Sequence, residues 1–167
     1  LLTEAFYLLG MSYSEHPRVG LELCRVLADA AGVRGMIGGQ AIDIRAQETI
    51  QSVEGLERMH RLKTGKLISA SVDGAAVLAN VSGEERKLWQ QFAEELGLAF
   101  QIADDLLDAE TENKAELSKS YVGFLGRNGA LQELSRRSQQ ALGYLRKTGR
   151  QSSELEMIIK YNEQRTH

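Results

Sequence analysis

The stretch FQIADDLLDAE, residues 100–110, decides how this chain folds, because it joins the pattern of a buried helix to a group of acids. Apolar residues recur every three or four positions before and within it, which predicts one apolar face of an amphipathic helix. They are Leu88, Phe92, Leu96, Ala99, Ala103, Leu106 and Leu107. Asp104, Asp105 and Asp108 lie at the end of this helix. A helix that is built for burial needs a reason to end in three carboxylates.

The spacing of the acids suggests a metal. Asp104 and Asp108 are four residues apart and share a helix face, while Asp105 lies about 100° round the axis. Gln101, three residues before Asp104, joins the same stripe. Like charges at this spacing repel one another, and more strongly when they are partly buried. A divalent cation would offset the repulsion, and hard oxygen ligands favour Mg²⁺. A solvated acidic turn at a helix end is the alternative, and it is the commoner meaning of an isolated DDxxD pattern.

A second polar group lies in HRLKTGKLISAS, residues 60–71. Lys63, Thr64 and Gly65 are predicted to interrupt two helical stretches there. They would offer an ammonium, a hydroxyl and free backbone N–H groups together, which suits a phosphate. A plain helix–helix turn is the alternative.

A third group lies in GMIGGQAIDIRAQ, residues 35–47, where Gln40 and Asp43 share a helix face. Three glycines precede or flank them, and each costs about 1 kcal/mol in a helix relative to alanine. Those glycines are Gly35, Gly38 and Gly39. The close approach of another helix or of a ligand would explain them.

The whole chain is predicted to be all-α. It has one proline and 6% aromatic residues, and no sustained alternation of apolar and polar residues is present. The polar segment 109–118 is predicted to be a loop within one domain. The expected helices span 2–12, 17–31, 34–48, 53–64, 66–80, 84–108, 118–146 and 152–165.

Local signals mark several helix ends. Gly32 and Gly149 can end helices, because glycine adopts the left-handed conformation at little cost. Ser82 with Glu85 fits a capping box, and Ser52 fits an N-cap.

The bulk composition excludes several classes of protein. Of the 167 residues, 43% are hydrophobic, which is enough for one domain with a core. There are 20 Lys and Arg residues against 23 Asp and Glu residues, so the net charge of −3 does not predict a nucleic-acid surface. No apolar run is long enough to cross a membrane. One cysteine excludes an internal disulfide, and a cytoplasmic location is expected.

Weaker candidates receive structural interpretations. His16 and His60 lack metal-ligand spacing and are expected to be structural or exposed. The Arg136–Arg137 pair is predicted to lie on a solvated face.

Taken in order, GMIGGQAIDI, HRLKTGKLI and FQIADDLLD resemble the conserved blocks of the trans-isoprenyl diphosphate synthases, the polyprenyl synthetase family, of the farnesyl and geranylgeranyl diphosphate synthase type. LLTEAFYLL resembles the helix that enters the dimer contact of that family, and LEMIIKYNEQR resembles its C-terminal helix. The resemblance covers almost all of this chain but only about the C-terminal half of the family's sequence. We therefore expect residues 1–167 to be the C-terminal portion of a single isoprenoid synthase domain, a helical bundle lacking the N-terminal helices.

The resemblance implies a role for each candidate residue. The metal ligands would be Asp104, Asp105 and Asp108, which would share Mg²⁺ with the diphosphate of the allylic substrate. The substrate-binding residues would be Gln40, Asp43, Lys63 and Gln101. The catalytic residues would be Lys63, Thr64 and Asp104, with the Thr64 side chain and carbonyl near the developing carbocation.

The resemblance also implies an activity and partners. The expected activity is the Mg²⁺-dependent head-to-tail condensation of an allylic diphosphate with isopentenyl diphosphate by a homodimer. The first aspartate-rich motif of the family should precede Leu1, so this piece alone is expected to be inactive. A lysine of the family has no clear counterpart, and Lys114 or Lys119 would replace it. Alternatives are a non-catalytic partner subunit or scaffold with the same fold, and a terpene cyclase, which the KTG and GGQ blocks disfavour.

Overall fold

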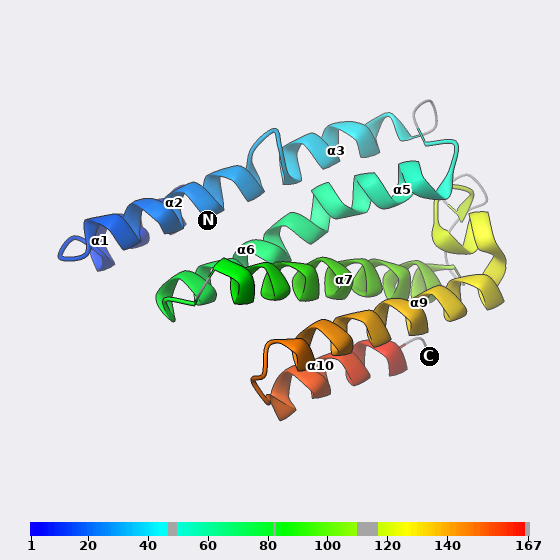
Figure 1. Cartoon of the computed structure of the whole chain (residues 1–167). Helices are drawn as coiled ribbons and strands as arrows, with labels where there is room; N and C mark the ends of the chain where they lie inside the picture. The colour runs from blue at the N-terminus through cyan, green and yellow to red at the C-terminus, as the bar shows by residue number, and fades with distance from the viewer. Residues whose placement is uncertain (47–49, 82, 110–116, 166–167) are drawn as a thin grey trace.

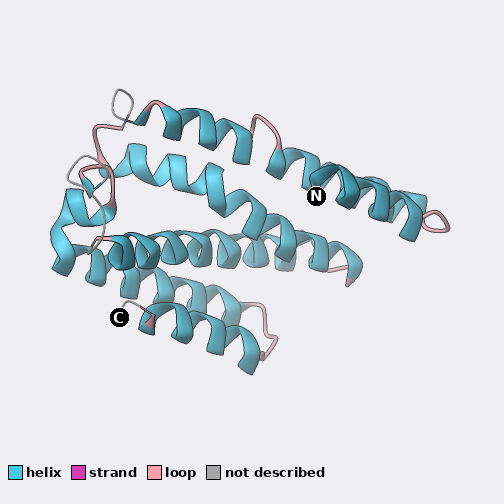
Figure 2. Ribbon diagram, turned by 180° about the vertical axis from the view of Figure 1, so that it is seen from behind, coloured by secondary structure: helices cyan, strands magenta, loops and turns pink. Residues whose placement is uncertain are grey.

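The computed structural model describes residues 1–46, 50–81, 83–109 and 117–165, and within these ranges the chain forms helices and connecting turns without a strand (Figures 1 and 2). The all-α prediction is therefore confirmed. In chain order the elements are α1 (Leu2–Ser12), α2 (Pro17–Ala31), α3 (Met36–Ile44), α5 (Val53–His60), the π-helical turn η1 (Arg61–Gly65), α6 (Lys66–Leu78), α7 (Gly83–Asp108), α9 (Tyr121–Lys147) and α10 (Ser153–Gln164).

The helices are arranged as successive antiparallel rows (Figure 1). The first row contains α2 and α3, with α1 folded back against α2, and the second contains α5, η1 and α6. The third, fourth and fifth rows are α7, α9 and α10. Because α6, η1, α9 and α10 all contact α7, this helix forms the centre of the bundle.

The apolar face predicted for α7 forms the core. Phe92, Ala99, Ala103 and Leu106 are buried, while the remaining predicted members of that face are half-buried. At the C-terminal end of α7 these residues join a cluster with Leu56 of α5 and other apolar side chains. At the other end, Phe92 packs in a second cluster with residues of α9 and α10.

Most of the predicted helix ends have the predicted local cause. The Ser52 hydroxyl accepts a hydrogen bond from the Gly55 N–H at 3.2 Å, as expected of an N-cap. Gly149 has φ of 73°, the left-handed conformation expected after a helix. Gly32 ends α2, as predicted, but its φ of −75° and ψ of −164° are extended, so the left-handed conformation expected there is wrong. The predicted capping residue Ser82 lies outside the described residues.

The predicted break at Lys63, Thr64 and Gly65 is wrong. The chain runs from α5 through η1 into α6 as one helical rod, and the N–H of Lys66 donates to the carbonyl of Arg61 five residues earlier. A π-turn is wider than an α-turn, and such turns often occur at functional sites. The amides of this segment therefore do not form the free helix N-terminus that the sequence pattern suggested.

Two further differences concern the helices on either side of the candidate site. The predicted helix 34–48 begins at Met36, because Gly35 is its N-cap, and its described part ends at Ile44. The helix predicted over 118–146 begins at Tyr121 and bends at Gly126, whose φ of 69° requires a residue without a side chain. Most of the predicted loop 109–118 lies outside the described residues.

Over the described ranges, no helix has the length and apolar character needed to cross a bilayer.

Candidate active site

The candidate polar residues lie across three neighbouring rows of the bundle. Gln40 and Asp43 lie on α3, Lys63 and Thr64 lie on η1, and Gln101 lies with Asp104 on α7. The rows contact one another at this level, since η1 packs against both α3 and α7. Segments that are far apart in sequence are therefore brought together, as the resemblance implied.

The first half of the site joins α3 to η1. The Nζ atom of Lys63 lies 2.6 Å from Oδ2 of Asp43, and both side chains are about one-third exposed. The side-chain amide of Gln40 donates to the same oxygen at 3.4 Å. Gln40 and Asp43 thus share a face, as predicted, and Asp43 holds the Lys63 ammonium at the surface of the bundle.

The second half joins η1 to α7. The Thr64 hydroxyl donates to Oε1 of Gln101, and Nε2 of Gln101 donates to Oδ2 of Asp104 at 3.2 Å. The Gln101–Asp104 stripe predicted from the helix spacing is therefore present. Because the Thr64 proton is used in this chain of hydrogen bonds, the lone pairs of its oxygen remain to interact with positive charge.

Close backbone packing explains one of the three glycines before Gln40. A Cβ atom added to Gly39 would lie 2.2 Å from the backbone nitrogen of Lys63, so only glycine lets α3 approach η1 this closely. Gly35 and Gly38 have another cause, because a Cβ atom on each would collide with a carbonyl oxygen of the preceding turn, that of Ala30 or Val33. The predicted close approach of a second helix is thus confirmed for Gly39.

The acids of the DDxxD segment have different surroundings. Asp104 is half-buried, whereas Asp108 is exposed at the end of α7. Oδ2 of Asp105 accepts a hydrogen bond from the backbone N–H of Tyr121 at 2.7 Å, and so joins α7 to the start of α9. In the described part of the chain, no three acidic, histidine or cysteine side chains converge as a ready-made metal site.

His60 lies behind the site and is buried, with 7% of its surface exposed. Its ring stacks on that of Tyr121, with 5.8 Å between the centroids, and Nε2 lies 3.9 Å from Oδ2 of Asp105. Burial lowers the pKa of the imidazole to about 4, so it is neutral at physiological pH. His60 is therefore structural, as one of the two sequence interpretations had it.

Sequence reasoning missed Arg165, the residue that follows α10. Nη2 of Arg165 lies 2.6 Å from Oδ1 of Asp104, and its guanidinium lies over the ring of Phe100 with 4.3 Å to the centroid. A basic residue at a helix end gives no sign of which acid it will meet, and no local pattern marked this one.

Two lysines, Lys114 and Lys119, are the candidates to replace the family lysine that has no clear counterpart in this chain. Lys119 donates to the backbone carbonyl of Ile50 at 2.7 Å, which ties the segment before α9 to the segment before α5. Lys114 lies outside the described residues.

Comparison with known proteins agrees with the resemblance. The family model described as "Polyprenyl synthetase" matches residues 1–123, most of the chain. The chain is 34% identical to a farnesyl diphosphate synthase of Geobacillus stearothermophilus, over 100% of this chain and 60% of that protein. This chain belongs to the polyprenyl synthetase family.

Solved structures agree on the fold. An FPP/GFPP synthase from Zymomonas mobilis, solved in its apo form, is 34% identical with a TM-score of 0.85 over 96% of this chain and 57% of that one. A geranyltransferase from Helicobacter pylori, solved with magnesium and isoprenyl diphosphate, is 30% identical with a TM-score of 0.78 over 96% of this chain and 55% of that one. The fold is thus that of the isoprenyl diphosphate synthases, and the chain spans somewhat more than half the length of these relatives.

Proposed function

We propose that the full-length protein is a short-chain trans-prenyl diphosphate synthase, which condenses an allylic diphosphate with isopentenyl diphosphate head to tail in a Mg²⁺-dependent reaction. The observation that carries this proposal is the chain of hydrogen bonds from Thr64 of η1 through Gln101 to Asp104 of α7, on the turn that also holds Lys63 beside Asp43. An ammonium, a hydroxyl and a carboxylate on adjoining elements suit a diphosphate and its metal. The family's other members named above are prenyl synthases, and this supports the same class of reaction here.

The donor chemistry of the acids fits Mg²⁺. This ion is usually held by one or two carboxylates together with water and substrate phosphates, so a three-residue protein cage is not needed. We propose Asp104, Asp105 and Asp108 as the ligands. Asp104 and Asp108 share a helix face. The carboxylate of Asp105 already accepts a hydrogen bond from the Tyr121 N–H, so it would have to bind the metal and this N–H together. The solved relative with magnesium and isoprenyl diphosphate supports the choice of metal.

In the proposed reaction, each chain residue has a distinct task. Lys63 binds a diphosphate oxygen of the allylic substrate through its ammonium, and Gln101 binds the same group through its amide. Gln40 and Asp43 would lie beside the bound diphosphate, and Asp43 also orients Lys63. Bound Mg²⁺ would supply Lewis-acid stabilisation of the departing diphosphate.

The proposed chemical steps use these residues in turn. The allylic C–O bond breaks, and the electron pair leaves with the diphosphate. The Thr64 hydroxyl oxygen and backbone carbonyl stabilise the positive charge on the allyl group through their dipoles. The double bond of isopentenyl diphosphate then forms the new C–C bond, and the proton lost from the adduct goes to the released diphosphate.

An assay of the full-length protein tests this proposal. With Mg²⁺, geranyl diphosphate and labelled isopentenyl diphosphate, we expect a longer prenyl diphosphate. Asp104→Asn should lower kcat/KM by about 100-fold or more, because a charged ligand to the metal is lost. Asp29→Asn is the matched control, since Asp29 is a similarly exposed acid that pairs with Arg34 at 2.6 Å away from the site. The alternative, a non-catalytic partner subunit or scaffold, predicts no product from the wild-type protein.

We also propose a homodimer formed through α1. This helix has no buried residue, and it exposes large apolar side chains. They are Leu2, Tyr7, Leu8 and Met11. Tyr7, Leu8 and Met11 fall within about 100° of one another round the helix axis, and an exposed apolar face of this kind is typical of an interface. Analytical ultracentrifugation of the full-length protein tests this proposal, and the double substitution of Leu8→Glu with Met11→Glu should shift the protein toward a monomer.

We further propose a cytoplasmic location.

A further inference from the structure

The π-turn η1 presents Lys63 and Thr64 to two different neighbours, so the two side chains keep their places only if the turn keeps its register. Lys63 bonds to Asp43 on α3, and Thr64 bonds to Gln101 on α7. The i→i−5 hydrogen bond from Lys66 to Arg61 defines that register. A π-turn is rare without support from surrounding structure.

On its inner side, the turn is supported by backbone contacts. Gly39 lies directly against the backbone of Lys63, as described above. A Cβ atom added to Gly97 of α7 would lie 3.1 Å from Cα of Gly65 and so would be tight. Both neighbours therefore pack on the turn without an intervening flexible side chain.

On its outer side, the turn borders a cavity of about 540 Å³, lined by Arg61, Leu62 and residues of α5 and α7. Packed apolar side chains therefore provide less support here than on the inner side. Arg61, the first residue of η1, reaches from the turn across this side to acids of α5 and α7. Its guanidinium lies 3.2 Å from Glu94 on α7 and 3.6 Å from Glu57 on α5.

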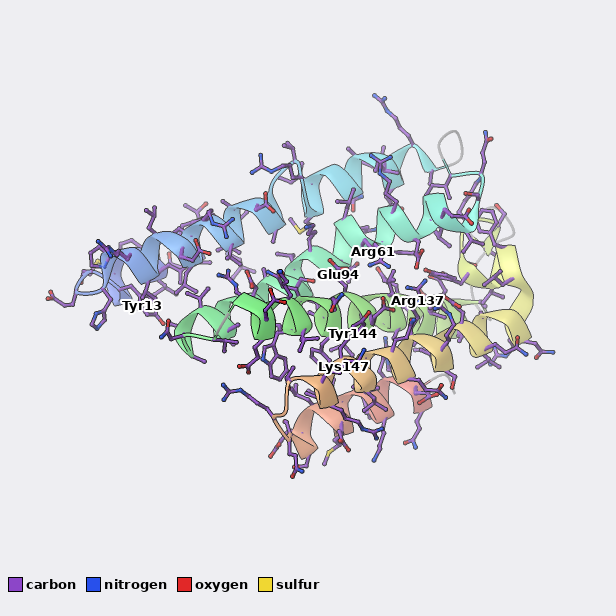
Figure 3. All side chains as sticks on the ribbon, in the orientation of Figure 1. Tyr13, Arg61, Glu94, Arg137, Tyr144 and Lys147 are labelled. Carbon is purple, nitrogen blue, oxygen red and sulfur yellow. The ribbon has the colours of Figure 1, made fainter. Side chains whose placement is uncertain are left out.

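Arg61 also connects the turn to a buried ion cluster. Its guanidinium lies 4.0 Å from Glu95, and both Glu57 and Glu95 bind Arg137 of α9 as well. Arg137 is only 8% exposed and bonds to Glu133 at 2.7 Å, so the predicted solvated face is wrong for this residue. Figure 3 shows Arg61, Glu94 and Arg137 in the space between η1, α7 and α9.

The charges explain how loss of Arg61 would reach the site. Glu57, Glu94 and Glu95 face one another across α5 and α7, and Arg61 lies among all three. Without that guanidinium, Glu94 would lose the cation at 3.2 Å, and Glu57 and Glu95 would share Arg137 alone. The excess negative charge between α5 and α7 would act on the joint between α5 and η1.

We infer that Arg61 is a positioning residue: it holds η1 in register against α7, so that Lys63 and Thr64 are aligned for the diphosphate. The part of this inference that concerns diphosphate binding rests on the proposed function. The part that concerns the register of η1 does not depend on that function.

The test compares three variants of the full-length protein. Arg61→Gln removes the charge, and Arg61→Lys keeps it. Arg86→Gln is the matched control, because Arg86 is also on the bundle's surface and pairs with Asp73 at 2.6 Å and Glu22 at 3.0 Å, far from η1 along α7. The first readout is hydrogen exchange at the amide of Lys66, which reports the π-turn directly. The second is the affinity for pyrophosphate with Mg²⁺, measured by calorimetry.

We expect Arg61→Gln to speed exchange at Lys66 about tenfold and to weaken pyrophosphate binding about five- to tenfold. Arg61→Lys should restore part of both, and Arg86→Gln should lower the melting temperature without changing either. Equal exchange at Lys66 in Arg61→Gln and Arg86→Gln would overturn the inference. If wild-type protein does not bind pyrophosphate, the proposed function fails, while the exchange result still decides the role of Arg61.

Discussion

Nη2 of Arg165 donates a hydrogen bond to Oδ1 of Asp104, with 2.6 Å between the two atoms, and so connects the end of α10 to the DDxxD segment of α7. The same nitrogen donates to the carbonyl of Phe100 at 3.0 Å, and Nε donates to Asn162 at 2.7 Å. Arg165 is therefore fixed on several sides. In this arrangement, one oxygen of a proposed metal ligand is already bound to a positive charge, so a metal and Arg165 compete for it.

This competition gives the first prediction. Arg165→Ala should raise the affinity of the substrate-free protein for Mg²⁺ by about two- to fivefold, because a partly exposed ion pair of this kind contributes up to about 1 kcal/mol. Titration with Mn²⁺ followed by electron paramagnetic resonance measures the change. Arg150→Ala is the control, since Arg150 pairs with Glu85 at the opposite end of the same helix. Equal metal affinities in both variants would show that Asp104 is not a ligand.

The second prediction concerns Lys63. Lys63→Ala should raise KM for the allylic diphosphate by roughly 10- to 100-fold, because a charge-assisted hydrogen bond contributes about 1.5–3 kcal/mol. Steady-state kinetics at saturating isopentenyl diphosphate measures this effect. Lys66→Ala is the control, because Lys66 lines cavities on the other side of the helix. An unchanged KM in Lys63→Ala would leave η1 without a role in binding.

The helices could be predicted from the sequence because their causes are local. The three- and four-residue apolar period of α7 and the Ser52 cap are each set within one turn or one helix. The shared faces of Gln40 with Asp43 and of Gln101 with Asp104 follow from helix geometry in the same way. These two pairs supply most of the residues of the candidate site that could be predicted.

What could not be predicted depends on contacts between distant segments. KTG forms a π-turn rather than a break, and Gly39 and Gly97 let two other helices pack on the backbone of that turn. Arg137 is buried because carboxylates from α5, α7 and α9 surround it, and no neighbour in sequence indicates this. The same holds for Arg165 and Asp104, which are joined only when α10 lies along α7.

The third prediction is a dependence of stability on pH. The Arg86 guanidinium lowers the pKa of the Asp73 carboxyl, and hydrogen bonds from Arg25 and Arg86 lower the pKa of Glu22 to about 2. Because these pKa values are depressed in the folded state, the ion pairs stabilise it fully above the ordinary pKa values of 3.8 for Asp73 and 4.5 for Glu22, and they lose that effect as the pH falls below these values. Asp73→Asn should therefore cost about 2–3 kcal/mol near pH 7 and much less near pH 2.

Urea unfolding of the wild type and of Asp73→Asn across this range measures the difference in the free energy of unfolding. Glu84→Gln is the control, because Glu84 is highly exposed and forms an exposed ion pair with Lys87 at 2.8 Å. It should show little difference from the wild type at any pH. A difference for Asp73→Asn that stays constant with pH would contradict the assignment of a lowered pKa to this carboxyl.

The last prediction tests the contact that brings α3 against the π-turn. Gly39→Ala should destabilise the protein by about 3 kcal/mol or more, because its Cβ atom would lie 2.2 Å from the backbone nitrogen of Lys63 and backbone cannot move aside as a side chain can. Gly143→Ala is the opposite case: nothing lies within 4 Å of a Cβ atom there, near the C-terminal end of α9, so alanine should stabilise by up to about 1 kcal/mol. Chemical denaturation of both variants measures the two free energies of unfolding.

Since Gly39 acts on the backbone of η1, pyrophosphate binding in the folded fraction of Gly39→Ala should also weaken, whereas Gly143→Ala should leave it unchanged. A Gly39→Ala protein as stable as the wild type would mean that α3 and η1 do not touch as closely as described, and that Asp43 is not held beside Lys63 by this packing.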